Sequence, residues 1–93
     1  MIDGEEISGE VQVVNRAGMH ARPAAMLVKL AGSFSASIHV EKDGLQVNGK
    51  SIMGVLMLAA EQGSTLRFSA TGDDAVEAVE ALMDLVRRGF EEE

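Results

Sequence analysis

The sequence predicts an α+β fold, an open-faced sandwich in which a four-stranded antiparallel sheet carries three helices on one face. Two observations lead to this prediction. Segments with an apolar period of two alternate with segments whose apolar residues recur at helical spacing, in the order β-α-β-β-α-β-α. One tight hairpin joins the middle strands and helices make the other connections, so right-handed crossovers place the helices on one side of the sheet.

The first strand and the first helix lie on either side of a loop. Val11 and Val13 alternate with polar neighbours, which is typical of a half-buried strand. The segment NRAGMH then forms a loop, and Pro23 fits the first turn of a helix, where its missing N–H is not needed. Gly32 is a suitable C-terminal stop for this helix. Its apolar residues recur at helical spacing: Ala24, Leu27, Val28 and Ala31.

A hairpin and a short helix follow. In the run SIHVEKDGLQVN, residues 37–48, apolar residues alternate on both sides of an Asp-Gly pair, which predicts two strands joined by a tight turn. Ser51 is a suitable N-cap for a short helix over residues 51–58. The hairpin therefore occupies the middle of the predicted element order.

The last part of the chain predicts a strand and a long helix. Leu66, Phe68 and Ala70 alternate with polar residues and are expected to face inward. The polar run TGDD then caps a helix with an apolar stripe, formed by Val76, Val79, Met83, Val86 and Phe90. Ninety-three residues with 46% hydrophobic content fit a single domain over residues 1–93. We expect only residues 1–8 and 91–93 to be loosely held.

Composition narrows the functional classes. The formal net charge of −7 argues against nucleic-acid binding, which requires clustered Lys and Arg. The absence of cysteine excludes disulfides and thiolate chemistry, and it suits a reducing compartment. The N-terminus lacks the apolar region of a secretory signal, and the longest apolar run is too short to span a bilayer. We expect a cytoplasmic protein with no membrane insertion.

Reactive groups gather in GMHARPAA, which lies within an acid-free stretch over residues 11–40. A neutral imidazole is nucleophilic at pH 7. The start of a helix offers unpaired N–H groups and the positive end of the helix dipole, and Arg22 adds a planar fork of donors that matches phosphate oxygens. The pattern predicts that His20 carries a phosphoryl group, that Arg22 stabilises it and that Pro23 fixes the helix start.

Other chemistry fits less well. His39 alternates with Ile38 and Val40, so it is expected to face solvent. Two histidines on different elements make a poor metal site without further ligands, and we expect no metal and no cofactor. No second catalytic group or nucleotide loop accompanies His20, which argues against a self-contained enzyme. One alternative stays open, a non-catalytic regulatory module in which Ser51 and the 51–58 helix matter more than His20.

The segments GMHARPAA and KSIMGVLML together resemble the histidine-containing phosphocarrier (HPr) family of the phosphoenolpyruvate-dependent phosphotransferase system, including its nitrogen-branch paralogue NPr. The resemblance runs from about Glu10 to Phe90 and implies the same sandwich fold. It implies that His20 accepts phosphate on Nδ1 from phosphorylated Enzyme I and donates it to a IIA domain, in sugar transport or its regulation. Such a protein is a carrier and not an enzyme. NRAGMHARPA and RRGFEEE resemble NPr, whereas KSIMGV resembles HPr, so the branch stays open.

The 51–58 helix predicts a docking surface. A helix this short buries only one side, yet it is apolar nearly all round, so some of its Ile, Leu and Met side chains are expected to be exposed. The resemblance implies that Enzyme I and IIA domains dock here. It also implies that HPr kinase/phosphorylase can modify Ser51 and that a transcriptional regulator can bind. We expect a monomer whose partner-binding residues are Met19, Ala21, Lys29, Ile52, Met53 and Leu56.

Overall fold

A computed structural model of the chain describes residues 5–92. Its α-helices and strands follow the predicted order, and a short 3-10 helix is added near the C-terminus. The strands are β1 (Ile7–Gln12), β2 (Ser37–Lys42), β3 (Leu45–Asn48) and β4 (Thr65–Thr71). The helices are α1 (Ala21–Gly32), α2 (Ile52–Met57), α3 (Ala75–Arg87) and the 3-10 helix η1 (Gly89–Glu91). No helix within residues 5–92 is long and apolar enough to cross a membrane.

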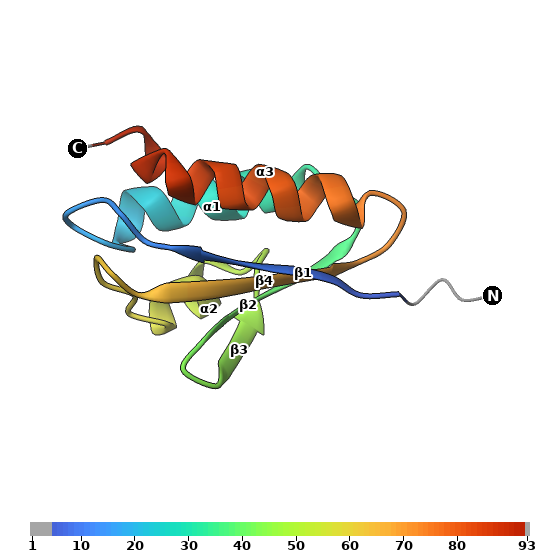
Figure 1. The fold of residues 1–93 in the computed structure, drawn as a ribbon, viewed down its shortest axis with the longest axis horizontal. Helices are drawn as coiled ribbons and strands as arrows, with labels where there is room; N and C mark the ends of the chain where they lie inside the picture. Colours follow the sequence, from blue (N-terminus) through green and yellow to red (C-terminus); the bar gives the residue numbers. More distant parts are fainter. Residues whose placement is uncertain (1–4, 93) are drawn as a thin grey trace.

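The strands form one antiparallel sheet in the order β1-β4-β2-β3. Asp43 and Gly44 both have positive φ, 52° and 86°, as the tight turn of the β2–β3 hairpin requires. Helices α1 and α3 pack beside each other over the sheet (Figure 1). The predicted α+β open-faced sandwich is therefore confirmed.

The core lies between the sheet and the helices. The inward-facing residues of β4 and β2 are buried, as predicted; they are Leu66, Phe68, Ala70, Ile38 and Val40. Helix α1 adds a buried stripe that consists of Pro23, Ala24, Leu27 and Ala31. Because Pro23 packs into this core, the start of α1 is held firmly against the sheet layer.

Helix α3 departs from the predicted apolar stripe. Val76 is 47% exposed, and the buried face consists of Ala75, Ala78, Val79, Leu82, Leu85 and Val86. The helix ends at Arg87, because Gly89 adopts a left-handed conformation with φ of 67° just after the helix end. Phe90 still reaches the core, but it does so from η1 and not from α3.

Both ends of the described chain carry more structure than we expected. β1 begins at Ile7, so Ile7 and Ser8 belong to the sheet. Glu91 and Glu92 make side-chain contacts with other residues. These four residues differ from the expectation that 1–8 and 91–93 are loosely held; residues 1–4 and 93 lie outside the described residues.

Candidate functional site

His20 is the N-cap residue of α1. Its backbone is extended, and its carbonyl accepts a hydrogen bond from the N–H of Ala24 at 2.9 Å. Its imidazole does not cap the helix and is 43% exposed. The N–H groups of Ala21 and Arg22 have no earlier turn to bond, and Pro23 has no N–H. The imidazole therefore stands at the positive end of the helix dipole.

The loop before His20 is fixed by close backbone packing. The N–H of Met19 donates to the carbonyl of Ala60 at 2.8 Å, and the Met19 side chain is buried in the core. Gly18 has φ of 71°, and a Cβ there would lie 2.6 Å from the same carbonyl oxygen. Met19 thus anchors the loop but presents no side-chain surface to a partner, which corrects its place in the predicted docking set.

A carboxylate that the sequence analysis missed lies against both predicted site residues. Oε1 of Glu92 is 3.2 Å from Nε2 of His20, and Oε2 is 3.7 Å from a guanidinium nitrogen of Arg22. The Nδ2 group of Asn15 donates to the same Oε1 at 3.0 Å. The Glu92 side chain is 16% exposed, whereas Arg22 is 75% exposed. Glu92 is therefore enclosed by its partners, and Arg22 remains free to reorient.

The C-terminal segment reaches the site because it folds back after α3. Gly89, Phe90 and Glu91 have consecutive positive φ values of 67°, 55° and 62°. Phe90 is buried, which anchors this turn in the core, and the N–H of Glu92 donates to the carbonyl of Gly89. The only sequence signal for this turn is the aromatic residue that directly follows the glycine at the helix end.

The environment of Glu92 favours its charged form. Hydrogen bonds from His20 and from Asn15 lower the pKa of Glu92 below its usual value, and the positive charge of Arg22 acts in the same direction. Since a glutamate with a lowered pKa is ionised at neutral pH, the site holds a carboxylate beside the imidazole.

Ser51 occupies the predicted capping position of α2. Its Oγ accepts a hydrogen bond from the N–H of Gly54 at 3.1 Å. The ammonium group of Lys50 does not reach it in this structure but donates to the carbonyl of Phe34 at 2.7 Å. The cap is therefore made by the Ser51 hydroxyl group.

The apolar side chains of α2 are partly exposed, as predicted. Ile52 and Met53 are 40% and 68% exposed, and Met57 is 66% exposed. Leu56 is partly buried against the core, and α2 packs against α1. Exposed Ile and Met side chains therefore form an apolar surface on α2, next to the helix that carries His20.

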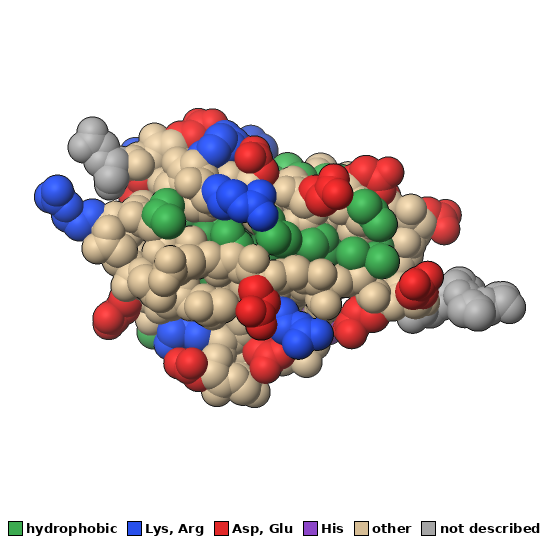
Figure 2. Space-filling view, in the orientation of Figure 1, with side chains coloured by type: hydrophobic (Ala, Val, Ile, Leu, Met, Phe, Trp, Pro, Cys, Tyr) green, Lys and Arg blue, Asp and Glu red, His purple; other side chains and the backbone are tan. Residues whose placement is uncertain are grey.

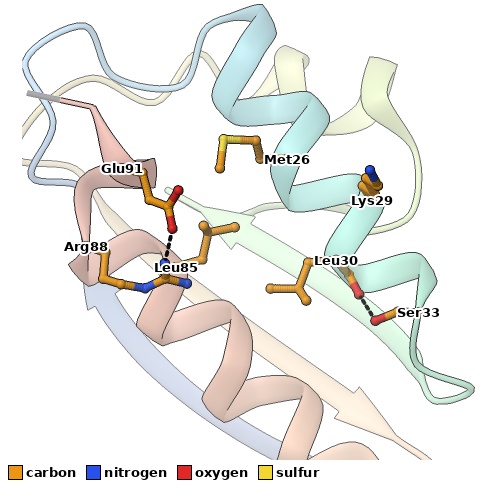
Figure 3. Close-up of a pocket in the computed structure, with 7 residues that line it drawn as sticks. All are labelled: Met26, Lys29, Leu30, Ser33, Leu85, Arg88 and Glu91. Atoms are coloured by element: carbon orange, nitrogen blue, oxygen red, sulfur yellow. Dashed lines mark hydrogen bonds and ion pairs between the residues drawn. The ribbon is translucent and has the colours of Figure 1, made fainter.

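The groove between α1 and α3 is separate from this site. It has a volume of about 480 Å³ and an apolar floor with a polar rim (Figure 3). Arg88 is held at the rim by Asp84 and Glu91. The lining residues include neither His20 nor Arg22; they are Met26, Lys29, Leu30, Ser33, Leu85, Arg88 and Glu91. Lys29 therefore lies at this groove, on the last turn of α1 and not at its start.

Two further predictions concern the exposure of His39 and the binding of nucleic acid. His39 is exposed on β2, as predicted. Acidic and basic side chains are interspersed on the face shown in Figure 2, with no continuous basic patch on that face of the kind that binds nucleic acid.

Comparison with known proteins identifies the family. The chain matches a family model described as the PTS HPr component phosphorylation site, over residues 7–88. It belongs to the HPr family. The phosphocarrier protein HPr of Treponema pallidum is 48% identical over 83 residues, covering 89% of this chain and 94% of the relative. The resemblance stated from the two sequence motifs is therefore confirmed.

Solved structures of the HPr family have the same fold. A crystal structure of HPr from Thermoanaerobacter tengcongensis aligns with a TM-score of 0.90 and 47% identity, covering 94% of this chain and 98% of that one. Crh from Bacillus subtilis, described as a domain-swapped dimer, aligns with a TM-score of 0.72 and 42% identity, covering 85% of this chain and 91% of that one. The family therefore includes HPr and HPr-like variants.

Proposed function

We propose that this protein is a phosphocarrier of the phosphotransferase system. His20 accepts a phosphoryl group on Nδ1 from phosphorylated Enzyme I and passes it to a IIA domain, in sugar transport or its regulation. The observation that carries the proposal is the exposed imidazole at the N-cap of α1, beside Arg22, in a chain of the HPr family. We place this protein in the cytoplasm, as proposed for a carrier of this family.

The chemistry of the site suits a transfer intermediate. A phosphoryl group on His20 would lie near the free N–H groups of Ala21 and Arg22 and the positive end of α1. The guanidinium of Arg22 is 75% exposed, and its 3.7 Å contact with Glu92 is longer than a hydrogen bond, so it can turn to the phosphoryl oxygens. The partner proteins supply the donor and the acceptor of the phosphoryl group, and this chain carries it between them. We therefore propose a carrier and not an enzyme.

The exposed surface of α2 is the proposed docking site. Ile52, Met53 and the exposed part of Leu56 can adapt to several partners, because Met and Ile side chains fit differently shaped apolar surfaces. Ala21 is exposed and follows His20 directly in the chain, so we include it in the proposed docking surface. Lys29 adds a positive charge further along α1. We propose that a monomer docks on Enzyme I and on IIA domains in turn.

Ser51 is the proposed site of regulation by HPr kinase/phosphorylase. Phosphorylation would place nearly two negative charges beside Ile52 and Met53. A partner that docks there must then desolvate this charge, so phosphorylation of Ser51 would weaken docking.

A second candidate function is a regulatory interaction module that binds a transcriptional regulator. The likeness to Crh, described as a catabolite repression protein, favours it, together with the exposed apolar side chains of α2. In that case Ser51 and α2 carry the function and His20 is incidental.

Incubation with Enzyme I and labelled phosphoenolpyruvate separates the two candidates. We expect an acid-labile, base-stable label on the wild-type protein that is chased onto an added IIA domain. His39→Ala serves as the matched control, because His39 is an exposed histidine on a different element, and it should be labelled normally. His20→Ala should fold but take up no label. Absence of label on the wild-type protein with compatible Enzyme I preparations would favour the interaction module.

A further inference from the structure

We propose that Glu92 is a positioning residue for His20: its carboxylate holds the proton of the imidazole on Nε2 and so leaves Nδ1 as the free acceptor nitrogen. This inference rests on the phosphocarrier function proposed above, because the choice of nitrogen matters only when the ring accepts a phosphoryl group. Three contacts of Glu92 support it, with His20, Asn15 and Arg22.

The contact between Glu92 and His20 decides which ring nitrogen carries the proton. An ionised carboxylate has acceptors only, so a ring nitrogen that hydrogen-bonds to it must be the donor. Nε2 of His20 lies 3.2 Å from Oε1 of Glu92 and therefore donates its N–H to it. In a neutral imidazole the other nitrogen then holds the lone pair. That nitrogen is Nδ1, the atom proposed to accept the phosphoryl group.

The carboxylate is held in a defined place. Asn15 is 2% exposed, and its Nδ2 donates one hydrogen to the carbonyl of Gly18 at 2.9 Å and the other to Glu92 at 3.0 Å. Turning the amide round would bring its oxygen against these two acceptors, so the contacts fix its orientation. The buried Phe90 anchors the turn that brings Glu92 to this position. Glu92 is therefore a structured part of the site.

The transfer step explains why this arrangement helps. The lone pair of Nδ1 forms the new N–P bond, while the bond between phosphorus and Enzyme I breaks and its electron pair stays with Enzyme I. The Nε2 proton remains on the ring, which gains positive charge as the N–P bond forms. The Glu92 carboxylate stabilises that charge, much as carboxylates that accept the free N–H of metal-bound histidines do. No proton has to leave His20 during the step.

Glu92 also makes a loose contact with Arg22. Oε2 lies 3.7 Å from the guanidinium, which is longer than a hydrogen bond, and Arg22 is largely exposed. This loose contact brings the guanidinium to the carboxylate that also contacts His20, but it does not hold the guanidinium there. When the phosphoryl group arrives, Arg22 can exchange the carboxylate for phosphoryl oxygens, which carry more charge.

The test uses nitrogen NMR of the unphosphorylated, 15N-labelled protein together with transfer kinetics. Glu92→Ala removes the acceptor, and Glu92→Gln keeps an acceptor oxygen without the charge. Glu91→Ala is the matched control, because Glu91 is the adjacent acid of the same turn and pairs with Arg88. We expect 15N shifts typical of an Nε2–H ring in the wild type, Glu92→Gln and Glu91→Ala. In Glu92→Ala the two ring shifts should move toward each other as the Nδ1–H form appears.

Phosphorylation by Enzyme I should slow about twofold to fivefold in Glu92→Ala, the size expected for a partly exposed ion pair, with Glu92→Gln between this variant and the wild type. Unchanged 15N shifts in Glu92→Ala, or a wild-type ring protonated on Nδ1, would overturn the role of Glu92 while leaving the carrier function intact. Absence of any transfer to the wild type would instead overturn the carrier function itself.

Discussion

Substitutions at Ser51 separate its structural role from its proposed regulatory role. Its Oγ makes one capping hydrogen bond, to the N–H of Gly54 at 3.1 Å. Loss of an N-cap side chain costs about 1 kcal/mol, and a domain of this size loses roughly 4–8 °C in Tm for each kcal/mol. Ser51→Ala should therefore lower the Tm by about 4–8 °C. Ser51→Asp keeps a capping oxygen and should change the Tm little.

The rate of phosphotransfer to His20 should show the opposite pattern to the Tm: normal in Ser51→Ala and lower in Ser51→Asp. Ser51→Ala adds no charge beside Ile52 and Met53, so His20 should be phosphorylated by Enzyme I at the normal rate. Ser51→Asp, and more strongly the kinase-modified protein, places a negative charge on the docking surface. If docking is weakened by about 1.4 kcal/mol, the rate at low protein concentration falls tenfold. We expect a decrease of about this size.

Two assays are made on the wild type, Ser51→Ala, Ser51→Asp and the kinase-modified protein. They are a thermal melt and the rate of labelling from phosphoenolpyruvate through Enzyme I. Slow transfer with an intact Tm in Ser51→Asp supports regulation through the docking surface. A large decrease in Tm on kinase modification would mean that the phosphate cannot be accommodated at the cap. Normal transfer by the modified protein would refute the regulatory role of Ser51.

Three further perturbations test the site and its support. Arg22→Ala should fold normally and slow transfer by about one to two decades, since a charge-assisted hydrogen bond contributes about 1.5–3 kcal/mol. If the variant and the wild type transfer at equal rates, both from Enzyme I and to a IIA domain, Arg22 does not have this role. Gly18→Ala forces a positive φ on alanine and a contact of 2.6 Å, so its urea midpoint should decrease by the equivalent of about 1–3 kcal/mol. The N–H groups of Ser35 and Ala36 donate hydrogen bonds to Asp74 and lower its pKa in the folded protein. The ionised Asp74 therefore stabilises the fold fully above the pKa that it has in the unfolded chain. This stabilisation is lost as the pH falls through the lower pKa of the folded protein. Unfolding curves of Asp74→Asn should therefore depend less on pH in the acidic range than those of the wild type; identical pH dependence would contradict this.

The fold could be predicted from the sequence because its signals are local. Strand alternation, the Asp-Gly turn and the Ser51 cap each lie within a few residues of the structure they specify. The same holds for the main site residues. His20, Arg22 and Pro23 lie on one helix start, so their proximity follows from the chain itself.

The rest of the site depends on contacts between distant parts of the chain. Glu92 is 72 residues from His20 and 77 from Asn15, and no local pattern links them. Their meeting requires the positive φ at Phe90, a conformation that aromatic residues rarely adopt and that burial of this side chain supports. The sequence did not predict the burial of Met19 for a similar reason. That burial depends on the hydrogen bond between the Met19 N–H and the carbonyl of Ala60, which lies far away in the sequence.

Intact-mass measurement after incubation with Enzyme I and phosphoenolpyruvate shows directly whether His20 carries a phosphoryl group. We expect one added phosphoryl group on the wild type and on His39→Ala, none on His20→Ala, and loss of the group in acid. A phosphoryl group that remains on His20→Ala, or a wild-type protein that gains none from a compatible Enzyme I, would contradict it.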